Sequence, residues 1–312
     1  MAKKKTNNYS KKIFWVLLIF ILLFFGFMAI SLFGLLSLFF IPDEELSDGN
    51  VAEIEITGPI MGESAGGMFA SSEAVSKDIV ELIEKANEDE DIEAILFTIN
   101  SPGGGAVASA EIAEAIEASD KPNVALVREV GASGGYWIAS STDYIIAHEL
   151  SITGSIGVIG SYLEFAGLLE RYNITYQQLI SGDKKDLGIP FRELEEDEKE
   201  WLQDKLDKIH EVFIREVANN RGMSFSEIEI LADGSFYLGS EALEVNLIDQ
   251  LGGREEAKLY LEQELNATVE FKEYSQPKSF FEALAEIMYQ RSFFVGKGIG
   301  SMLFEESFEV KV

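Results

Sequence analysis

One serine of this chain lies where a nucleophile could be formed. The stretch Glu129–Ser140 reads EVGASGGYWIAS and follows the apolar run Val124–Val127. This order predicts a strand, a tight turn and the first turn of a buried helix, with Ser133 at the turn. Unpaired backbone N–H groups at such a turn favour negative charge, which suits an attack that creates an oxyanion. The simpler interpretation is that Ser133 only caps the helix.

A glycine-rich loop, Asn100–Gly105, is the second candidate. It reads NSPGGG and follows the apolar run 92–99. Three consecutive glycines let a backbone approach a ligand without a Cβ in the way, so that their N–H groups can point at a carbonyl oxygen. The loop is neither G-x-G-x-x-G nor a P-loop. A phosphate cradle or a plain turn stays open as an alternative.

A serine hydroxyl needs a base to become nucleophilic. The chain has only two histidines, His148 and His210, and neither lies in a glycine-rich or turn context. Lysine can replace histidine in this role. The segment 181–186, SGDKKD, supplies Lys184 and Lys185. The residues alone do not separate the two, and either could be an exposed turn lysine.

A lysine can act as a base at neutral pH only if its surroundings lower its pKa. The pKa of a free lysine, about 10.4, has to fall toward about 7–8 by burial in an apolar site. Ser155 lies in the small, apolar segment Gly154-Ser155-Ile156-Gly157. Its hydroxyl is a candidate hydrogen-bond partner for a neutral lysine amine.

Composition excludes several classes of site and partner. The 312 residues include no cysteine, so thiol nucleophiles, disulfides and cysteine-ligated metals are excluded. Two histidines do not make a histidine-rich metal site, and we expect neither a metal nor another cofactor. The net charge is −29. Such a surface repels phosphate backbones, so nucleic acid is not an expected partner.

The N-terminal region predicts a membrane anchor. Residues 1–12 are polar and basic, and residues 13–41 carry no charge. About 20 apolar residues span a bilayer, whereas a cleaved secretory signal has a shorter apolar region and a cleavage site, which is not evident here. Cleavage is the minor alternative. The positive-inside rule places the N-terminus in the cytoplasm and the part after the linker 42–50 outside the cell membrane.

Strands alternate with helices through the rest of the chain. We expect an α/β domain at 51–275 with parallel strands and ligands at their carboxyl ends. The tail 276–312 contains an aromatic amphipathic segment, 280–294. The predicted strands are 51–58, 92–99, 123–127, 144–147, 174–180 and 268–273. The predicted helices follow a cap at Ser72 and then cover 106–118, 162–171, 194–219, 226–232 and 254–266.

Four motifs occur in a fixed order: NSPGGG at 100–105, GASGGYWIAS at 131–140, TGSIGVIG at 153–160 and SGDKKDLG at 181–188. Together they resemble the signal peptide peptidase A family, which are membrane-anchored Ser-Lys peptidases of the ClpP/crotonase superfamily. The single motif set is similar to the half-length form of that family. The resemblance implies repeated ββα units as the fold. It assigns the nucleophile to Ser133, the base to Lys185, the lysine-orienting serine to Ser155 and the oxyanion hole to Gly104 and Gly134.

The resemblance also implies a function and an assembly. The expected enzyme is a single-pass membrane endopeptidase that degrades cleaved signal peptides and other hydrophobic peptides through an acyl-enzyme. The expected homo-oligomer is a ring, octameric in the half-length form, in which the lysine can come from the neighbouring subunit. Three alternatives stay open: a crotonase-like acyl-CoA enzyme, a non-catalytic peptide-binding scaffold, and a Ser-His-Asp peptidase that uses His148.

Overall fold

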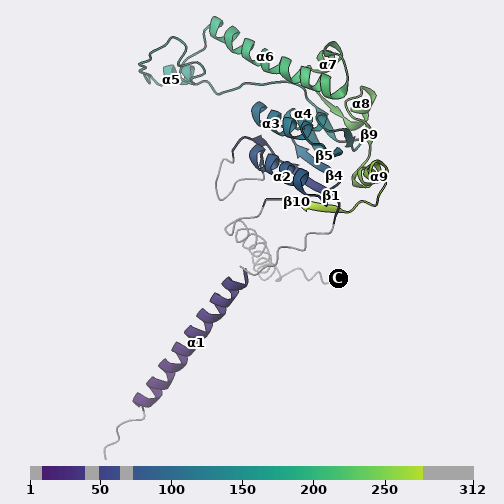
Figure 1. Ribbon diagram of the computed structural model, residues 1–312. Coiled ribbons are helices and arrows are strands. Elements are labelled where there is room, and N and C mark those ends of the chain that lie inside the picture. Colours follow the sequence, from purple (N-terminus) through teal and green to yellow (C-terminus); the bar gives the residue numbers. More distant parts are fainter. Residues whose placement is uncertain (1–8, 39–48, 64–72, 277–312) are drawn as a thin grey trace, which may run out of the picture. The chain divides into compact units, whose positions relative to one another are not determined.

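The computed structural model describes residues 9–38, 49–63 and 73–276, and the chain divides into two units, Met1–Ser47 and Asp48–Val312 (Figure 1). The described part of the first unit is the helix α1 (Tyr9–Leu38). Across the residues that the structure describes, no helix qualifies as a membrane span by length and apolar character. The anchor therefore stays a prediction. The predicted amphipathic tail segment lies outside the described residues.

The second unit is built on one eight-stranded sheet. Its members are β1 (Val51–Thr57), β4 (Ala94–Ser101), β5 (Asn123–Ala132), β6 (Tyr144–Ala147), β7 (Ile152–Gly154), β8 (Phe236–Leu238), β9 (Gln250–Leu251) and β10 (Phe271–Tyr274). The strand order is β10-β1-β4-β5-β6-β9, and all neighbours on this path are parallel. The end of β5 pairs with β7 instead of β6, and β8 runs antiparallel to β7. The predicted α/β class with a parallel sheet is confirmed.

Helices lie between most of these strands, since a short turn cannot join parallel neighbours. They are α2 (Ser76–Glu88), α3 (Ala106–Glu117), α4 (Gly134–Ser140), α5 (Ala166–Arg171), α6 (Glu196–Arg221), α7 (Phe225–Leu231), α8 (Gly239–Glu244) and α9 (Arg254–Leu265). A separate pair of short strands, β2 (Ile60–Met61) and β3 (Ala74–Val75), lies between β1 and α2 in the chain.

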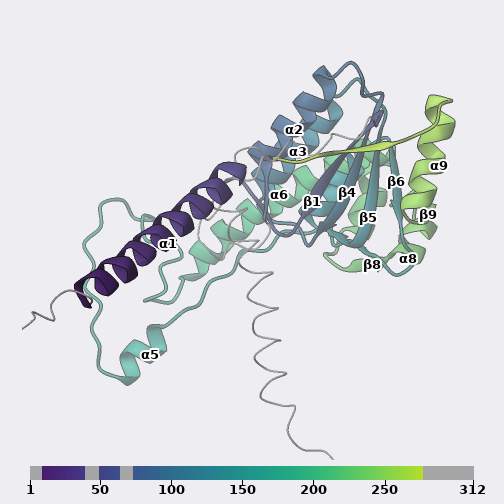
Figure 2. The same cartoon turned by 90° about the horizontal axis from the view of Figure 1, so that it is seen from below.

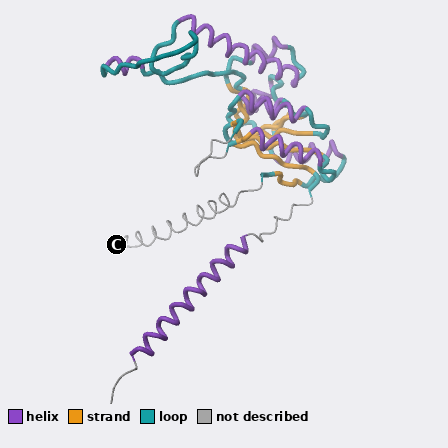
Figure 3. Tube along the Cα trace, turned by 60° about the vertical axis from the view of Figure 1, so that its left-hand side comes forward, coloured by secondary structure: helices purple, strands orange, loops and turns teal. Residues whose placement is uncertain are grey.

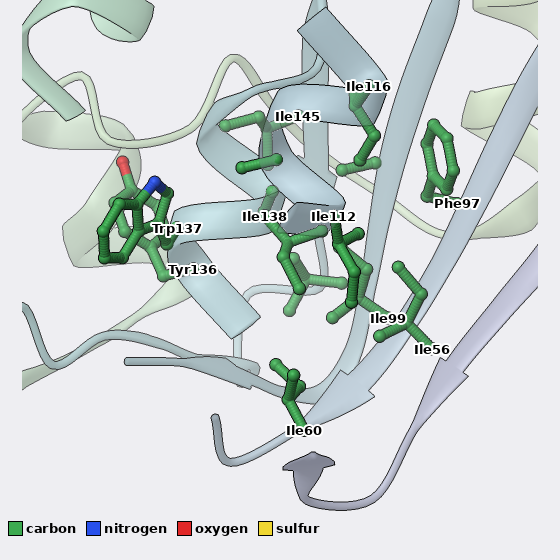
Figure 4. Packing of buried hydrophobic residues seen from close by; sticks show 14 of the residues in the cluster. Ile56, Ile60, Phe97, Ile99, Ile112, Ile116, Tyr136, Trp137, Ile138 and Ile145 are labelled. Carbon is green, nitrogen blue, oxygen red and sulfur yellow. The ribbon is translucent and has the colours of Figure 1, made fainter. Parts of the chain in front are cut away.

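Apolar side chains cover both faces of the sheet. Along β4, Ile95, Phe97 and Ile99 belong to one buried cluster, and the alternate residues Ala94 and Leu96 belong to a second. The first cluster packs under α2, α3 and α4, and the second under α9 (Figures 2 and 4). The carboxyl end of β4 leads into α3, and the carboxyl end of β5 leads into α4.

The segment between β7 and α6 differs most from prediction. The expected strand 174–180 is absent, and the expected helix 162–171 is reduced to α5 (Figure 3). Apolar residues of these two ranges, such as Leu163 and Leu179, are exposed in this chain. Helix α2 begins at Ser76 instead of after Ser72, a residue that the structure does not describe.

Helix α6 is likewise buried along only part of one apolar stripe, formed by Leu202, Leu206, Ile209, Phe213 and Val217. Phe213 and Val217 are buried, whereas Leu206 is half-buried and Ile209 is exposed. The C-terminal half packs on the first cluster. The stripe of the N-terminal half is only partly buried.

Candidate active site

Ser133 lies on a sharp turn between β5 and α4. Its backbone has φ +52° and ψ −122°, a conformation that costs energy for a residue with a Cβ. Its N–H donates to the Gly154 carbonyl at 2.8 Å. Its side chain makes no capping hydrogen bond to α4. Ser133 therefore occupies the N-cap position of α4 without using its side chain as a cap, and the hydroxyl stays available at a strained turn.

The glycine loop packs directly against this turn. A Cβ on Gly103 would lie 2.7 Å from the Gly134 nitrogen and 2.8 Å from the Ser133 Cβ. Strand β2 holds the loop from its other side, since Ile60 N–H donates to Gly103 O at 3.0 Å and Gly105 N–H donates to Ile60 O at 2.9 Å. Neither bond uses the N–H of Gly104.

Two backbone N–H groups are consequently left next to the serine. Within residues 49–63 and 73–276, no backbone acceptor takes the N–H of Gly104 or of Gly134. A Cβ on Gly134 would lie 3.3 Å from the Gly104 nitrogen, so the two peptides are close neighbours. Paired free donors beside a hydroxyl are the geometry that stabilises the oxyanion of acyl transfer.

A cavity of about 800 Å³ lies in front of these groups. Ser133, Gly104, Gly134 and Ser155 all line it. Its apolar wall includes Trp137 of α4 and Phe213 of α6, whose rings stack at 4.8 Å, and Leu206 and Ile209 of the same stripe. The cavity can therefore accept an extended apolar chain with its carbonyl at the serine.

Ser155 is held by a second turn. Its backbone also has a positive φ, +51°. Its N–H donates to Ser235 O at 3.0 Å, and its hydroxyl donates to Gly234 O at 3.2 Å. Asp233 fixes that turn by accepting the Ser235 N–H at 2.8 Å, and hydrogen bonding by Ser235 lowers the pKa of Asp233.

Lys185 lies apart from this group. It is exposed on the turn after Gly182 and is not among the residues that line the Ser133 cavity. Its neighbour Lys184 forms a surface ion pair with Asp197 at 3.3 Å. The single chain thus brings together four of the five predicted site residues and leaves the lysine outside.

Comparison with known proteins places this arrangement in a family. The profile of peptidase family S49 matches residues 115–268. A protein named "Putative protease" from Methanocaldococcus jannaschii is 31% identical over 94% of this chain and 96% of its own length. The "Putative signal peptide peptidase SppA" of Enterococcus faecium is 34% identical over 72% and 67%, respectively. "Protease 4" of Haemophilus influenzae is 30% identical over 69% of this chain and 35% of its own length.

The chain belongs to peptidase family S49. The predicted family is thereby confirmed, and the protein is a serine peptidase. The matched range of this S49 peptidase contains Ser133, Ser155 and Lys185. Gly104 precedes it, so its assignment rests on the geometry of the loop.

The two histidines of the S49 chain fall on different surfaces. His148 is exposed, accepts the Leu150 N–H at Nδ1 and lines a separate cavity beside Arg128 and Arg254. His210 projects from α6 into the Ser133 cavity, with Nε2 3.3 Å from Ile156 O. No local pattern in the sequence indicated that His210 reaches the cavity, because the contact depends on how α6 folds back.

Two buried serines form hydrogen bonds within or next to the glycine loop, and the sequence did not predict these contacts. Ser101 is fully buried, donates to Gly58 O at 2.6 Å and accepts the Gly103 N–H at 3.1 Å. Ser109 is also fully buried and donates to Gly105 O at 3.0 Å. Ser101 could have been recognised as a polar residue at the end of an apolar strand. In the described part of the chain no group of three His, Asp or Glu side chains is arranged to hold a metal.

Replacement of Gly104 by alanine should disable the loop. The new Cβ would lie 2.0 Å from Ile60 O, so the loop or β2 must shift and the Gly104 N–H must move. Loss of one oxyanion donor typically lowers kcat by about 10²–10³-fold, and we expect this loss in steady-state peptide hydrolysis. Gly105→Ala is the matched control, because its Cβ would meet nothing closer than 3.7 Å. Wild-type activity in both variants would contradict the assignment of the Gly104 N–H as an oxyanion donor.

Proposed function

We propose that this S49 peptidase is a membrane-anchored endopeptidase that degrades cleaved signal peptides and other hydrophobic peptides through an acyl-enzyme on Ser133. The observation that carries the proposal is the pair of free N–H groups, of Gly104 and Gly134, beside Ser133 in an apolar-walled cavity. The name of the Enterococcus faecium relative supports signal peptides as substrates. The parallel sheet with its carboxyl-end loop and turn supports a ClpP/crotonase-like domain at 51–275.

The chemistry follows from the proposed roles. Lys185 Nζ, in its neutral form, takes the proton of the Ser133 hydroxyl as Oγ attacks the peptide carbonyl. The N–H groups of Gly104 and Gly134 stabilise the resulting oxyanion. The lysine then gives the proton to the leaving amine, and the same base activates a water that hydrolyses the ester. The hydroxyl of Ser155 orients the neutral amine.

We assign the lysine of each site to a neighbouring subunit of a homo-oligomeric ring, octameric as in the half-length proteins that this chain resembles. The exposed position of Lys185, outside the cavity that Ser133 lines, supports this arrangement. Unburied apolar residues on the same segment also support it, among them Ile159 at 91% exposure and Leu163 at 75%. Large apolar side chains exposed in this number are typical of a protein interface when they gather in one patch. Docking would also bury the lysine.

The uncharged stretch 13–41 supports the anchor, and the preceding lysines support a cytoplasmic N-terminus. The catalytic domain then works outside the cell membrane. That location brings the cavity close to apolar peptides released in the bilayer.

Covalent labelling tests the proposed reaction against its alternatives. A fluorophosphonate should modify the full-length protein at Ser133, as read by peptide mass spectrometry, and the Ser133→Ala variant should stay unlabelled. The wild-type chain should hydrolyse hydrophobic peptides. Tight acyl-CoA binding in equilibrium dialysis, without labelling, would instead identify a crotonase-like enzyme. Peptide binding with neither labelling nor hydrolysis would identify a scaffold.

A further inference from the structure

The segment that carries Lys185 has almost no apolar core of its own. All of residues 157–200 are described, and Asp186 and Glu198 are the only buried ones among them. Both are carboxylates, and both bind the same arginine, Arg192. Buried carboxylates are costly unless they are paired, so this cluster needs a reason beyond surface solvation.

The contacts of Arg192 are short and directional. Its Nε donates to Asp186 Oδ2 at 2.5 Å. Its two terminal nitrogens donate to the two oxygens of Glu198, both at 2.7 Å, in a bidentate pair. Glu198 also accepts the Glu195 N–H at 2.9 Å and so completes the capping box of α6. One guanidinium therefore ties the lysine turn to the first turn of a 26-residue helix.

Lys185 is the residue immediately before Asp186. Its own N–H donates to Gly182 O at 3.1 Å, and Ile189 N–H donates to Asp186 O at 3.1 Å. The backbone on both sides of the lysine is consequently fixed, while its side chain stays exposed. We propose that Arg192 is a positioning residue, which holds the turn of Lys185 on α6 through Asp186 and Glu198 so that the amine reaches the serine of its site in one geometry. The inference rests on the proposed role of Lys185 as the base.

The cluster of Arg192, Asp186 and Glu198, called the clamp below, keeps its charges over the whole working pH range. Hydrogen bonding from Arg192 holds the pKa of Asp186 well below its usual range. Hydrogen bonds from Arg192 and from the Glu195 backbone lower the pKa of Glu198 to about 2. Neither carboxylate titrates between about pH 6 and 10, so changes in the pH profile in that range do not come from Asp186 or Glu198.

Other charged groups lie on the turn of Lys185 and next to it. Asp183 and Lys184 belong to the turn itself, and Asp197 of α6 pairs with Lys184. Removal of the Arg192 charge leaves Asp186 and Glu198 without their cation. Their negative charge, added to that of Asp183, would favour the protonated form of a nearby amine.

Two Arg192 variants of the full-length protein separate geometry from charge. Arg192→Gln removes both, and a catalytic group displaced by about 1 Å can cost about 10²-fold in rate. We expect a loss of that size in kcat/KM for a hydrophobic peptide, with the acidic limb of the pH profile moved to higher pH. Arg192→Lys keeps the charge but cannot form the planar fork. It should lose rate with the acidic limb close to that of the wild-type protein.

The matched control is Arg215→Gln, which removes an equal charge from an exposed position of α6, where Arg215 lies 3.7 Å from Glu216. It should keep wild-type activity and pH profile. Wild-type kcat/KM and pH profile in Arg192→Gln would overturn the inference. Loss of assembly in both Arg192 variants, measured by light scattering, would assign the cluster to folding and also overturn it.

Failure of the clamp is distinguishable from failure of the proposed function. An active Lys185→Ala variant would remove the base assignment, whatever the Arg192 variants do. An inactive Lys185→Ala variant together with wild-type behaviour of Arg192→Gln would overturn the clamp alone.

Discussion

Replacement of Lys185 by alanine in the full-length chain should lower kcat/KM for a hydrophobic peptide by about 10⁴-fold or more, as does loss of the base in other serine peptidases. The Ser133 hydroxyl would then have no group to accept its proton at neutral pH. Ser133→Ala should cause a loss of the same order. The double variant should be no worse than either single one, since the two groups act as a unit.

Lys184→Ala is the matched control for this prediction. Lys184 carries the same charge one position earlier, and its amine pairs with Asp197 on an exposed surface. Exposed pairs of this kind contribute about 0–1 kcal/mol, so the variant should keep near wild-type kinetics and assembly. A fully active Lys185→Ala variant would refute the dyad. If His210→Ala were then inactive, the base would be the histidine that lines the Ser133 cavity.

The parts of the site that the sequence predicted correctly are those formed by local order. An apolar strand, a glycine turn and an apolar helix follow one another around Ser133, and β5, Ser133 and α4 occupy those positions in the structure. The glycine loop was recognisable for the same reason, because adjacent strands of a parallel sheet end at the same edge. These contacts depend on neighbours in the sequence or in the strand order.

The parts that could not be predicted depend on distant contacts. Leu163 and Leu179 lie in segments predicted as a helix and a strand, yet no described surface of this chain buries them. The strand predicted at 174–180 accordingly has no sheet to join. His210 reaches the cavity only because α6 returns over the first cluster. The spacing of apolar residues along a segment does not show where a distant helix folds back. It also does not show which surfaces another copy of the chain supplies.

Mixing two inactive chains tests whether one site uses two subunits. A chain with Ser133→Ala keeps the lysine, and a chain with Lys185→Ala keeps the serine. If each site takes its serine from one subunit and its lysine from the next, random co-assembly in equal amounts restores about one quarter of the sites of a closed ring. Steady-state hydrolysis by co-expressed chains, purified through two different tags, should therefore rise from background to about that fraction.

The outcome also decides how the exposed segment is used. Co-assembly of the Ser133→Ala chain with the double variant gives no site with both groups, so it should stay at background and serves as the control. Inactive particles that contain both single variants would place serine and lysine of each site in one chain. The exposed segment that carries Lys185 would then have to fold back over its own cavity, and its apolar residues would be buried there. Recovery of activity would instead mean that assembly both buries these residues and brings the lysine to the serine.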